Sequence, residues 1–208
     1  EFGPLELTND EHADVLVLAG DICVVADLAQ RDSFNVRGEH DKSNKVHTFF
    51  QECCARFPHV VYIAGNHEHY HGDFNDTYRN LRSYLGYLEN LHILDKQSVK
   101  IDNVTFVGGT LWTDMNNEDR STLLTIEGLM NDFQCVKHSG KPEVEFKVDG
   151  KTYQHKYHRT AKFKPADAVI DHKEMLSFIE SETKNLYEKY VVVGHHAPSK
   201  LSTHPKYA

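Results

Sequence analysis

Three glycine-led corners in this sequence place metal-binding residue types directly after apolar runs. They are Gly20-Asp21, Gly65-Asn66-His67 and Gly194-His195. Asp, Asn and His offer oxygen and nitrogen donors that suit manganese, iron or zinc. A carboxylate can bridge two cations, and cations about 3.5 to 4 Å apart stabilise both the attacking and the leaving oxygen of an in-line displacement at phosphorus. The residue types therefore indicate a two-metal site for phosphate-ester chemistry.

The run before each corner predicts a buried strand. These strands are Asp14 to Ala19, His59 to Ala64 and Tyr190 to Val193, all rich in valine, leucine or isoleucine. The first is continuous enough to be expected buried on both faces. Ligands in open α/β sheets gather at the carboxyl ends of strands, and glycine permits unusual backbone angles and close approach there. We therefore expect Asp21, Asn66 and His195 to meet at one edge.

Apolar residues recur at helical spacing between these strands. The predicted helices are Lys45 to Phe57, Asp73 to Leu88 and Pro165 to Leu186. A polar stretch from Gln30 to Asn44 is expected to be a loop. The order of elements at the start of the chain is β, α, β, α, which indicates an α/β fold.

Shorter β segments complete the expected fold. Candidate meander strands are His92 to Leu94, Ser98 to Ile101 and Val104 to Gly108. Two alternating segments, Glu143 to Val148 and Thr152 to Tyr157, flank Asp149-Gly150, a pair that favours a tight hairpin turn. We interpret this hairpin, near residues 143–157, as an insertion outside the core sheets.

Composition narrows the class of protein. The 208 residues, 39% of them hydrophobic, favour one domain. The 23 basic and 31 acidic residues leave a formal charge of -8, which gives no electrostatic footprint for binding duplex nucleic acid or an anionic membrane. Without a signal peptide or an apolar run of about 20 residues, a cytoplasmic protein is expected. The four cysteines form no C-x-x-C pair and are expected to be reduced, with Cys23 in the core.

The glycine-led corners resemble the calcineurin-like metallophosphoesterases, whose ordered motifs are D-x-H, G-D, G-N-H-[D/E], G-H and G-H-x-H. The resemblance is closest to a bacterial and phage branch. The segments that carry it are GNHEHYHG (65–72), GTLWTD (109–114), MNDF (130–133) and HHAPS (195–199). It implies one partial phosphoesterase domain over residues 1–208, folded as a four-layer α/β/β/α sandwich.

The resemblance also implies a role for each matched residue. Asp21 would bridge two divalent ions, with manganese favoured over iron or zinc, and Asn66 and His195 would bind the second ion. His67 would stay outside the metal shell as the general acid for the leaving oxygen, oriented by Glu68. The implied reaction is hydrolysis of a phosphomonoester or phosphodiester by metal-bound hydroxide.

Two motifs of the family are not recognised. No D-x-H motif is expected ahead of Gly20 and no G-H-x-H after His195, although Glu1-Phe2 and His204-Pro205-Lys206 resemble the flanks of those motifs. The sequence is therefore interpreted as truncated at both ends and lacking four ligands. Little or no activity is expected of this segment alone.

Several alternatives stay open. The chain could instead be a non-catalytic metal- or nucleotide-binding interaction module, or a nuclease of the same family. The acidic balance weighs against a nuclease, yet nucleic acid remains a candidate substrate, and the oligomeric state is not determined by the sequence. His196 is expected to point away from its neighbour His195, and Trp112 is expected to be a packing anchor.

Overall fold

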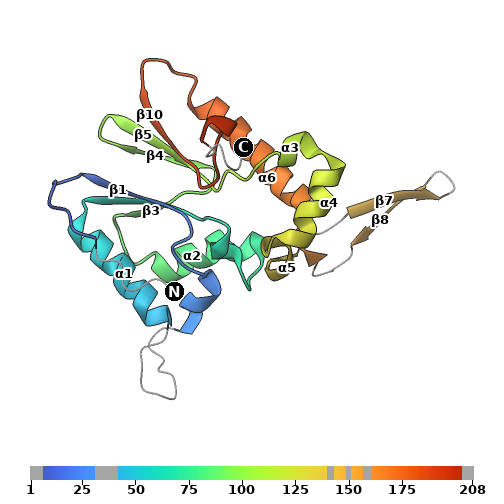
Figure 1. Cartoon of the computed structure of the whole chain (residues 1–208), viewed down its shortest axis with the longest axis horizontal. Coiled ribbons are helices and arrows are strands. Elements are labelled where there is room, and N and C mark those ends of the chain that lie inside the picture. The colour runs from blue at the N-terminus through green and yellow to red at the C-terminus, as the bar shows by residue number, and fades with distance from the viewer. Residues whose placement is uncertain (1–6, 31–41, 140–142, 149–150, 157–160, 203–208) are drawn as a thin grey trace.

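The computed structural model describes residues 7–30, 42–139, 143–148, 151–156 and 161–202. Most of the predicted loop from Gln30 to Asn44 lies outside these residues. Within the described part, the structure is a mixed α/β fold built around two three-stranded sheets (Figure 1). The predicted α/β class is therefore confirmed.

The first sheet is entirely parallel and carries helices on one face. Its strands are β1 (Val15–Ala19), β2 (His59–Ile63) and β3 (Leu91–Ile93), in the order β1-β2-β3. Helices α1 (Lys42–Arg56) and α2 (Thr77–Leu85) lie beneath it in Figure 1. The core between them includes Leu18, Phe50, Val60, Tyr62, Leu81 and Leu85. Burial of this face anchors the strands that lead to Asp21 and Asn66.

The second sheet packs against the other face of β2. It consists of β4 (Gln97–Ile101), β5 (Val104–Gly108) and β10 (Lys189–Val193), in the order β10-β5-β4, with β10 and β5 parallel. Side chains alternate along a strand, so Val61 and Ile63 face away from the helices and join Phe106 and Val193 in a core between the sheets. This packing brings the end of β10 close to the ends of β1 and β2.

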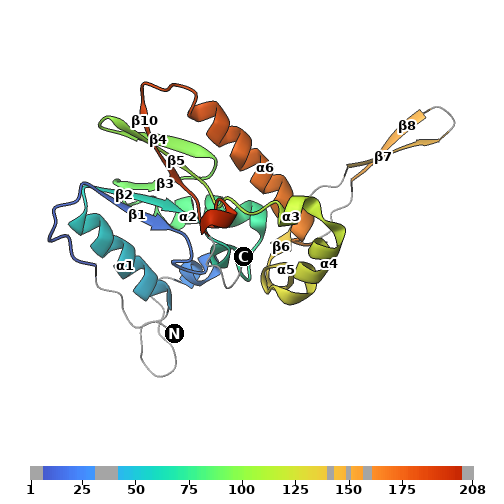
Figure 2. The ribbon, with the colours of Figure 1, turned by 45° about the horizontal axis from the view of Figure 1, so that its top comes forward.

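A helical region lies at the end of the molecule away from α1 (Figure 2). It contains α3 (Met115–Glu118), α4 (Arg120–Leu129), α5 (Asp132–Cys135), the short pair β6 (Lys137–His138) and β9 (Ala161–Lys162), and the start of α6 (Pro165–Glu182). Its own core includes Trp112, Phe133, Phe163, Ala168 and Val169. The helices between residues 115 and 135 were not predicted from the sequence.

The predicted hairpin is present. Strands β7 (Glu143–Val148) and β8 (Lys151–Lys156) pair antiparallel, and they extend away from the rest of the chain in Figures 1 and 2. The turn pair Asp149-Gly150 lies outside the described residues. The strands thus form outside both core sheets, as the alternating pattern indicated.

The prediction that the first strand is buried on both faces was wrong. Along β1 only Leu18 is buried, and Val17 is 39% exposed, because among the described residues the core between the sheets is centred on β2 and takes only Val15 from β1. The apolar composition of a strand shows which side chains could be buried. Whether they are buried depends on which other elements pack against the strand. No helix of the described part is long and apolar enough to cross a membrane.

Candidate metal centre

Three strand ends bring the predicted ligands together. β1 and β2 run parallel with Ala19 beside Ile63, so the corners that follow them leave the sheet at the same edge. From the second sheet, the main-chain amide of His195 donates to the carbonyl of Thr110 at 3.1 Å. The side chains of Asp21, Asn66, His67 and His195 then converge across the two sheets.

Two of the corner glycines permit this close approach. Gly20 has φ +89°, and a Cβ there would lie 2.5 Å from the Gly65 amide nitrogen. A Cβ on Gly65 would lie 2.8 Å from the His195 ring and closer still to the Asp21 carboxylate. Any larger residue at either position would push the three strand ends apart, so the reason for glycine is a steric one.

The buried carboxylate of Glu68 ties two of the corners together. It accepts hydrogen bonds from the main-chain amides of Asp21, Ile22, Cys23 and Gly65 and from the Tyr62 hydroxyl, at 2.7 to 3.2 Å. The prediction that Glu68 orients His67 was therefore wrong about its partners. Its oxygens instead hold the corner after β1 against the corner after β2, and hence fix the position of Asp21.

The hydrogen bonds of His195 leave acceptors facing one another. Its Nδ1 lies 2.7 Å from the carbonyl of Ala19, which can only accept, so Nδ1 carries the proton. Its Nε2 faces Asn66 Oδ1 at 3.2 Å and Asp21 Oδ1 at 3.4 Å. Three lone pairs thus point at one another unless a proton sits on Nε2 or a cation lies among them.

These donors fit a divalent cation. Ligand atoms bound about 2.0 to 2.2 Å from one tetrahedral or octahedral ion lie about 3.0 to 3.5 Å apart, which matches the separations of His195 Nε2 from the two oxygens. Among the described residues no group of three or more His, Cys, Asp or Glu side chains is placed to hold a metal. With the amide oxygen of Asn66 included, three ligand atoms from Asp21, Asn66 and His195 face one another. These three atoms provide ligands for one ion.

His67 lies at the open side of the cluster. Its side chain is 53% exposed, and its Nε2 lies 3.9 Å from Asp21 Oδ2. Its main-chain amide donates to Asp21 Oδ1 at 3.0 Å, and its ring stacks on Tyr70 with centroids 4.5 Å apart. The imidazole is therefore beside the proposed ligands, within reach of a group bound among them.

His196 and Trp112 take supporting positions. The ring of His196 is perpendicular to that of His195 and stacks on Trp112, with centroids 4.9 Å apart. Burial, together with the nearby His195, lowers the pKa of His196, so the neutral ring is favoured. Trp112 is 2% exposed and packs in the core of the helical region. The expectation of a packing anchor is confirmed.

Tyr70 contacts the cluster and Asp132 contacts Tyr70, but neither was predicted as a site residue. The Tyr70 hydroxyl donates to Asp132 Oδ2 at 3.2 Å and accepts from Asn66 Nδ2 at 3.5 Å. Burial, and next the Asp132 carboxylate, raises the pKa of Tyr70 to about 12. Both residues lie in segments that carried the family resemblance, yet no local pattern joins positions 62 residues apart.

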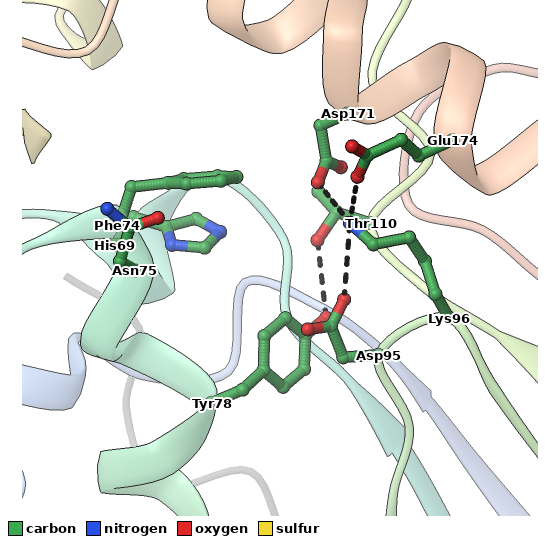
Figure 3. Close-up of a pocket in the computed structure, with 9 residues that line it drawn as sticks. All are labelled: His69, Phe74, Asn75, Tyr78, Asp95, Lys96, Thr110, Asp171 and Glu174. Carbon is green, nitrogen blue, oxygen red and sulfur yellow. Dashed lines mark hydrogen bonds and ion pairs between the residues drawn. The ribbon is translucent and has the colours of Figure 1, made fainter. Parts of the chain in front are cut away.

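A second polar cluster surrounds a cavity of about 210 Å³ between α2, α6 and the loop after β3 (Figure 3). The ammonium of Lys96 forms an ion pair with Asp171 and lies 3.3 Å from Glu174 and 3.9 Å from Asp95. One cation therefore already sits among three carboxylates. This cluster holds more formal charge than the strand-end cluster, with one ammonium against three carboxylates.

His69 lines the same cavity on the side opposite Lys96 (Figure 3). The Thr77 hydroxyl donates to the carbonyl of Asp73 at 3.2 Å, so its oxygen accepts a hydrogen bond from His69 Nδ1 at 2.8 Å. The buried Nε2 has no hydrogen-bond partner within the described part of the chain. Burial lowers the pKa of His69 to about 3, and the ring is neutral.

One triplet ahead of Gly20, Asp10-Glu11-His12, does have the D-x-H spacing, so the expectation that none exists there was wrong. The structure places this triplet just before β1, at the amino end of the strand. Asp21 follows the carboxyl end of the same strand. The triplet is therefore remote from the strand-end cluster and adds no ligand to it.

Comparison with known proteins adds an independent line of support. A family model for the calcineurin-like phosphoesterases matches residues 5–204. The chain is also similar to "Uncharacterized protein L509" of Acanthamoeba polyphaga mimivirus, with 26% identity over 165 residues, which cover 76% of this chain and 51% of that protein. The chain thus spans about half the length of this curated relative. No solved structure matches it significantly.

Proposed function

The chain belongs to the calcineurin-like phosphoesterase family, and we propose that it hydrolyses a phosphate ester at a metal centre held by Asp21, Asn66 and His195. The observation that carries this proposal is the convergence of three acceptors, with His195 Nε2 facing Asn66 Oδ1 at 3.2 Å and Asp21 Oδ1 at 3.4 Å. Such a set favours a divalent ion, and manganese is the ion we propose.

Divalent ions bound there supply Lewis-acid chemistry, polarising the phosphoryl oxygens and activating water for attack on phosphorus. The chain's own contribution is to orient the donors. Ala19 fixes the tautomer of His195 so that Nε2 is free to bind, and the His67 amide with Glu68 fixes Asp21. Preorganised donors of this kind need no rearrangement when an ion binds.

We propose His67 as the general acid. Its exposed ring lies beside Asp21, with Nε2 3.9 Å from Oδ2, and it is stacked on Tyr70 rather than turned into the cluster. A proton on Nε2 is then available to an ester oxygen that leaves from a phosphate bound at the centre. Imidazole suits this role near neutral pH.

The two-metal form is also part of the proposal. Asp21 would also hold a second ion, which needs ligands beyond the three that the described cluster provides. The complete domain would then take the four-layer α/β/β/α arrangement, of which the two packed sheets form the centre. Phosphomonoesters and phosphodiesters are both proposed substrates.

The test is release of nitrophenol from an aryl phosphate and from a bis-aryl phosphate, and of nucleotides from single-stranded DNA, with Mn²⁺ or with a chelator. We expect weak hydrolysis of an aryl ester that requires Mn²⁺ and is lost in Asp21→Asn. Hydrolysis that survives the chelator or this substitution would contradict the metal mechanism. Mn²⁺ binding without hydrolysis of any ester would favour the non-catalytic binding module.

A further inference from the structure

We propose that Tyr70 and Asp132 form a directed hydrogen-bond relay that keeps the amide oxygen of Asn66, and not its nitrogen, turned toward the metal centre. The inference rests on the proposed function, since it concerns one of the proposed ligands. It makes Tyr70 and Asp132 positioning residues that act through Asn66.

An asparagine ligand has an orientation problem. The two ends of its amide are nearly the same size, but only the oxygen offers lone pairs to a cation, while the nitrogen carries two protons. In the structure Oδ1 faces His195 Nε2 at 3.2 Å. A rotation of the Asn66 amide by half a turn would present N–H donors at that point and remove one of the three converging acceptors.

The direction of the relay follows from what each group can do. The Asp132 carboxylate accepts, so the Tyr70 hydroxyl donates its proton to Oδ2 at 3.2 Å. Having used its proton, the hydroxyl oxygen is available as an acceptor. The group that faces it, at 3.5 Å, is Asn66 Nδ2, which donates. Asn66 Oδ1 is thereby left on the side of His195.

The end of the relay is held firmly. Asp132 is 2% exposed at the start of α5, and its Oδ1 has no protein partner among the described residues, so the hydrogen bond to Tyr70 is made through Oδ2. Main-chain hydrogen bonds tie the same region to the segment of Tyr70, from His71 to the carbonyl of Cys135 at 3.1 Å and from Lys137 to that of Gly72 at 2.9 Å. The helical region thus fixes the acceptor that sets the amide.

The test is a cycle of substitutions at positions 70 and 66, read out as the Mn²⁺ dissociation constant from the electron paramagnetic resonance of free Mn²⁺. Tyr70→Phe keeps the ring that stacks on His67 but removes the hydroxyl, and it is expected to weaken binding roughly 10-fold, as loss of an outer-shell partner does. In an Asn66→Asp background both ends of the side chain are oxygens. There, Tyr70→Phe is expected to change the dissociation constant by less than about 2-fold, because either end of that side chain offers an oxygen to the cation.

Tyr190→Phe is the matched control. It also removes a hydrogen bond from a tyrosine to a carboxylate, between Tyr190 and Glu188 at 3.3 Å, but at an exposed part of β10. Its dissociation constant should equal that of the wild-type chain. Circular dichroism checks the fold of each variant, and Asp132→Ala, measured in both backgrounds, carries the same comparison if Tyr70→Phe does not fold.

Three results would overturn the relay. Unchanged Mn²⁺ affinity in folded Tyr70→Phe would show that Asn66 does not depend on the hydroxyl. An equal loss in the Asn66 and Asn66→Asp backgrounds would assign Tyr70 a general structural role instead. Failure of the wild-type chain to bind Mn²⁺ would remove the metal centre itself, and with it the relay, and so is distinguishable from the other two.

Discussion

The strand-end cluster (Asp21, Asn66 and His195) and the Lys96 cluster (Lys96, Asp95, Asp171 and Glu174) are both polar, but they differ in how their charges are satisfied. In the Lys96 cluster an ammonium lies among three carboxylates. In the strand-end cluster His195 Nε2 faces the oxygens of Asn66 and Asp21, and Asp21 has no lysine or arginine partner among the described residues. The strand-end cluster, unlike the Lys96 cluster, is therefore the one that we propose binds a cation from solution.

The two clusters also differ in what holds them. Main-chain groups of Ala19, His67 and the corners bound by Glu68 position the strand-end cluster. The Lys96 cluster depends on long side chains between a loop and α6. A site that must bind an ion without rearrangement benefits from the first kind of support. Substitutions in each cluster test whether function depends on the strand-end cluster and stability on the Lys96 cluster.

The largest effect is expected for His67→Ala. Loss of a general acid lowers kcat by about 10²- to 10⁴-fold, and the metal should be retained because His67 is proposed to lie outside its ligand set. Steady-state kinetics with an aryl phosphate ester and metal analysis of the purified protein measure the two quantities. Turnover near the wild-type rate would remove His67 from the mechanism.

Glu68→Gln should be the most destabilising of the conservative changes. The amide nitrogen of Gln would face main-chain N–H groups that now donate to the carboxylate, leaving buried donors unpaired at a cost of about 3 kcal/mol in the free energy of unfolding. Urea denaturation measures it. Glu174→Gln, at an exposed ion pair with Lys96, is the control and should cost less than about 1 kcal/mol. Equal stabilities would mean that Glu68 does not tie the corners.

His69 should make stability depend on pH. Its folded pKa of about 3 lies below its ordinary value of 6.5, so the unfolded chain binds the proton more tightly. This contribution to stability is complete above pH 6.5 and is lost as pH falls from 6.5 toward 3, at about 1.4 kcal/mol per pH unit. Between pH 7 and pH 5, the wild-type chain should lose about 2 kcal/mol more than His69→Gln does in urea denaturation. Parallel losses in the two proteins would contradict the assignment of a neutral, buried ring.

The smallest effect is expected for Lys96→Met. Removal of the ammonium leaves Asp171 and the partly buried Asp95 without their cation, at a cost of about 1 to 2 kcal/mol in unfolding free energy, because the lysine is partly exposed. Mn²⁺ affinity should not change. A large loss of Mn²⁺ binding in a folded Lys96→Met protein would break the division between the two clusters.

The strand-end cluster was predictable because its signal is local. Asp21, Asn66 and His195 each follow an apolar run with a single glycine in between, so the same place at three strand ends implied a common edge. Tyr70 and Asp132 meet only through tertiary packing of the helical region, and three of the groups that donate to Glu68 come from a corner 45 to 47 residues away. No periodicity in the sequence encodes such contacts.

The helices between residues 115 and 135 and the exposure of β1 were not predicted from the sequence. Helix α3 is short, with left-handed backbone angles at Asn116 and Asn117, and so lacks the spacing that reveals a longer helix. The exposure of β1 depends on which elements pack against it, which its apolar composition does not record. The hairpin strands β7 and β8 were found because alternation and an Asp-Gly pair are both local signals.

The most direct test of the account is titration of Mn²⁺ into the wild-type chain and into His195→Gln, with Lys96→Met as the control of comparable polarity. The account predicts saturable binding by the wild-type chain and by Lys96→Met, and a dissociation constant for His195→Gln that is weaker by more than roughly 10-fold. Equal affinity in the wild-type chain and His195→Gln, or loss of binding in folded Lys96→Met alone, would contradict it.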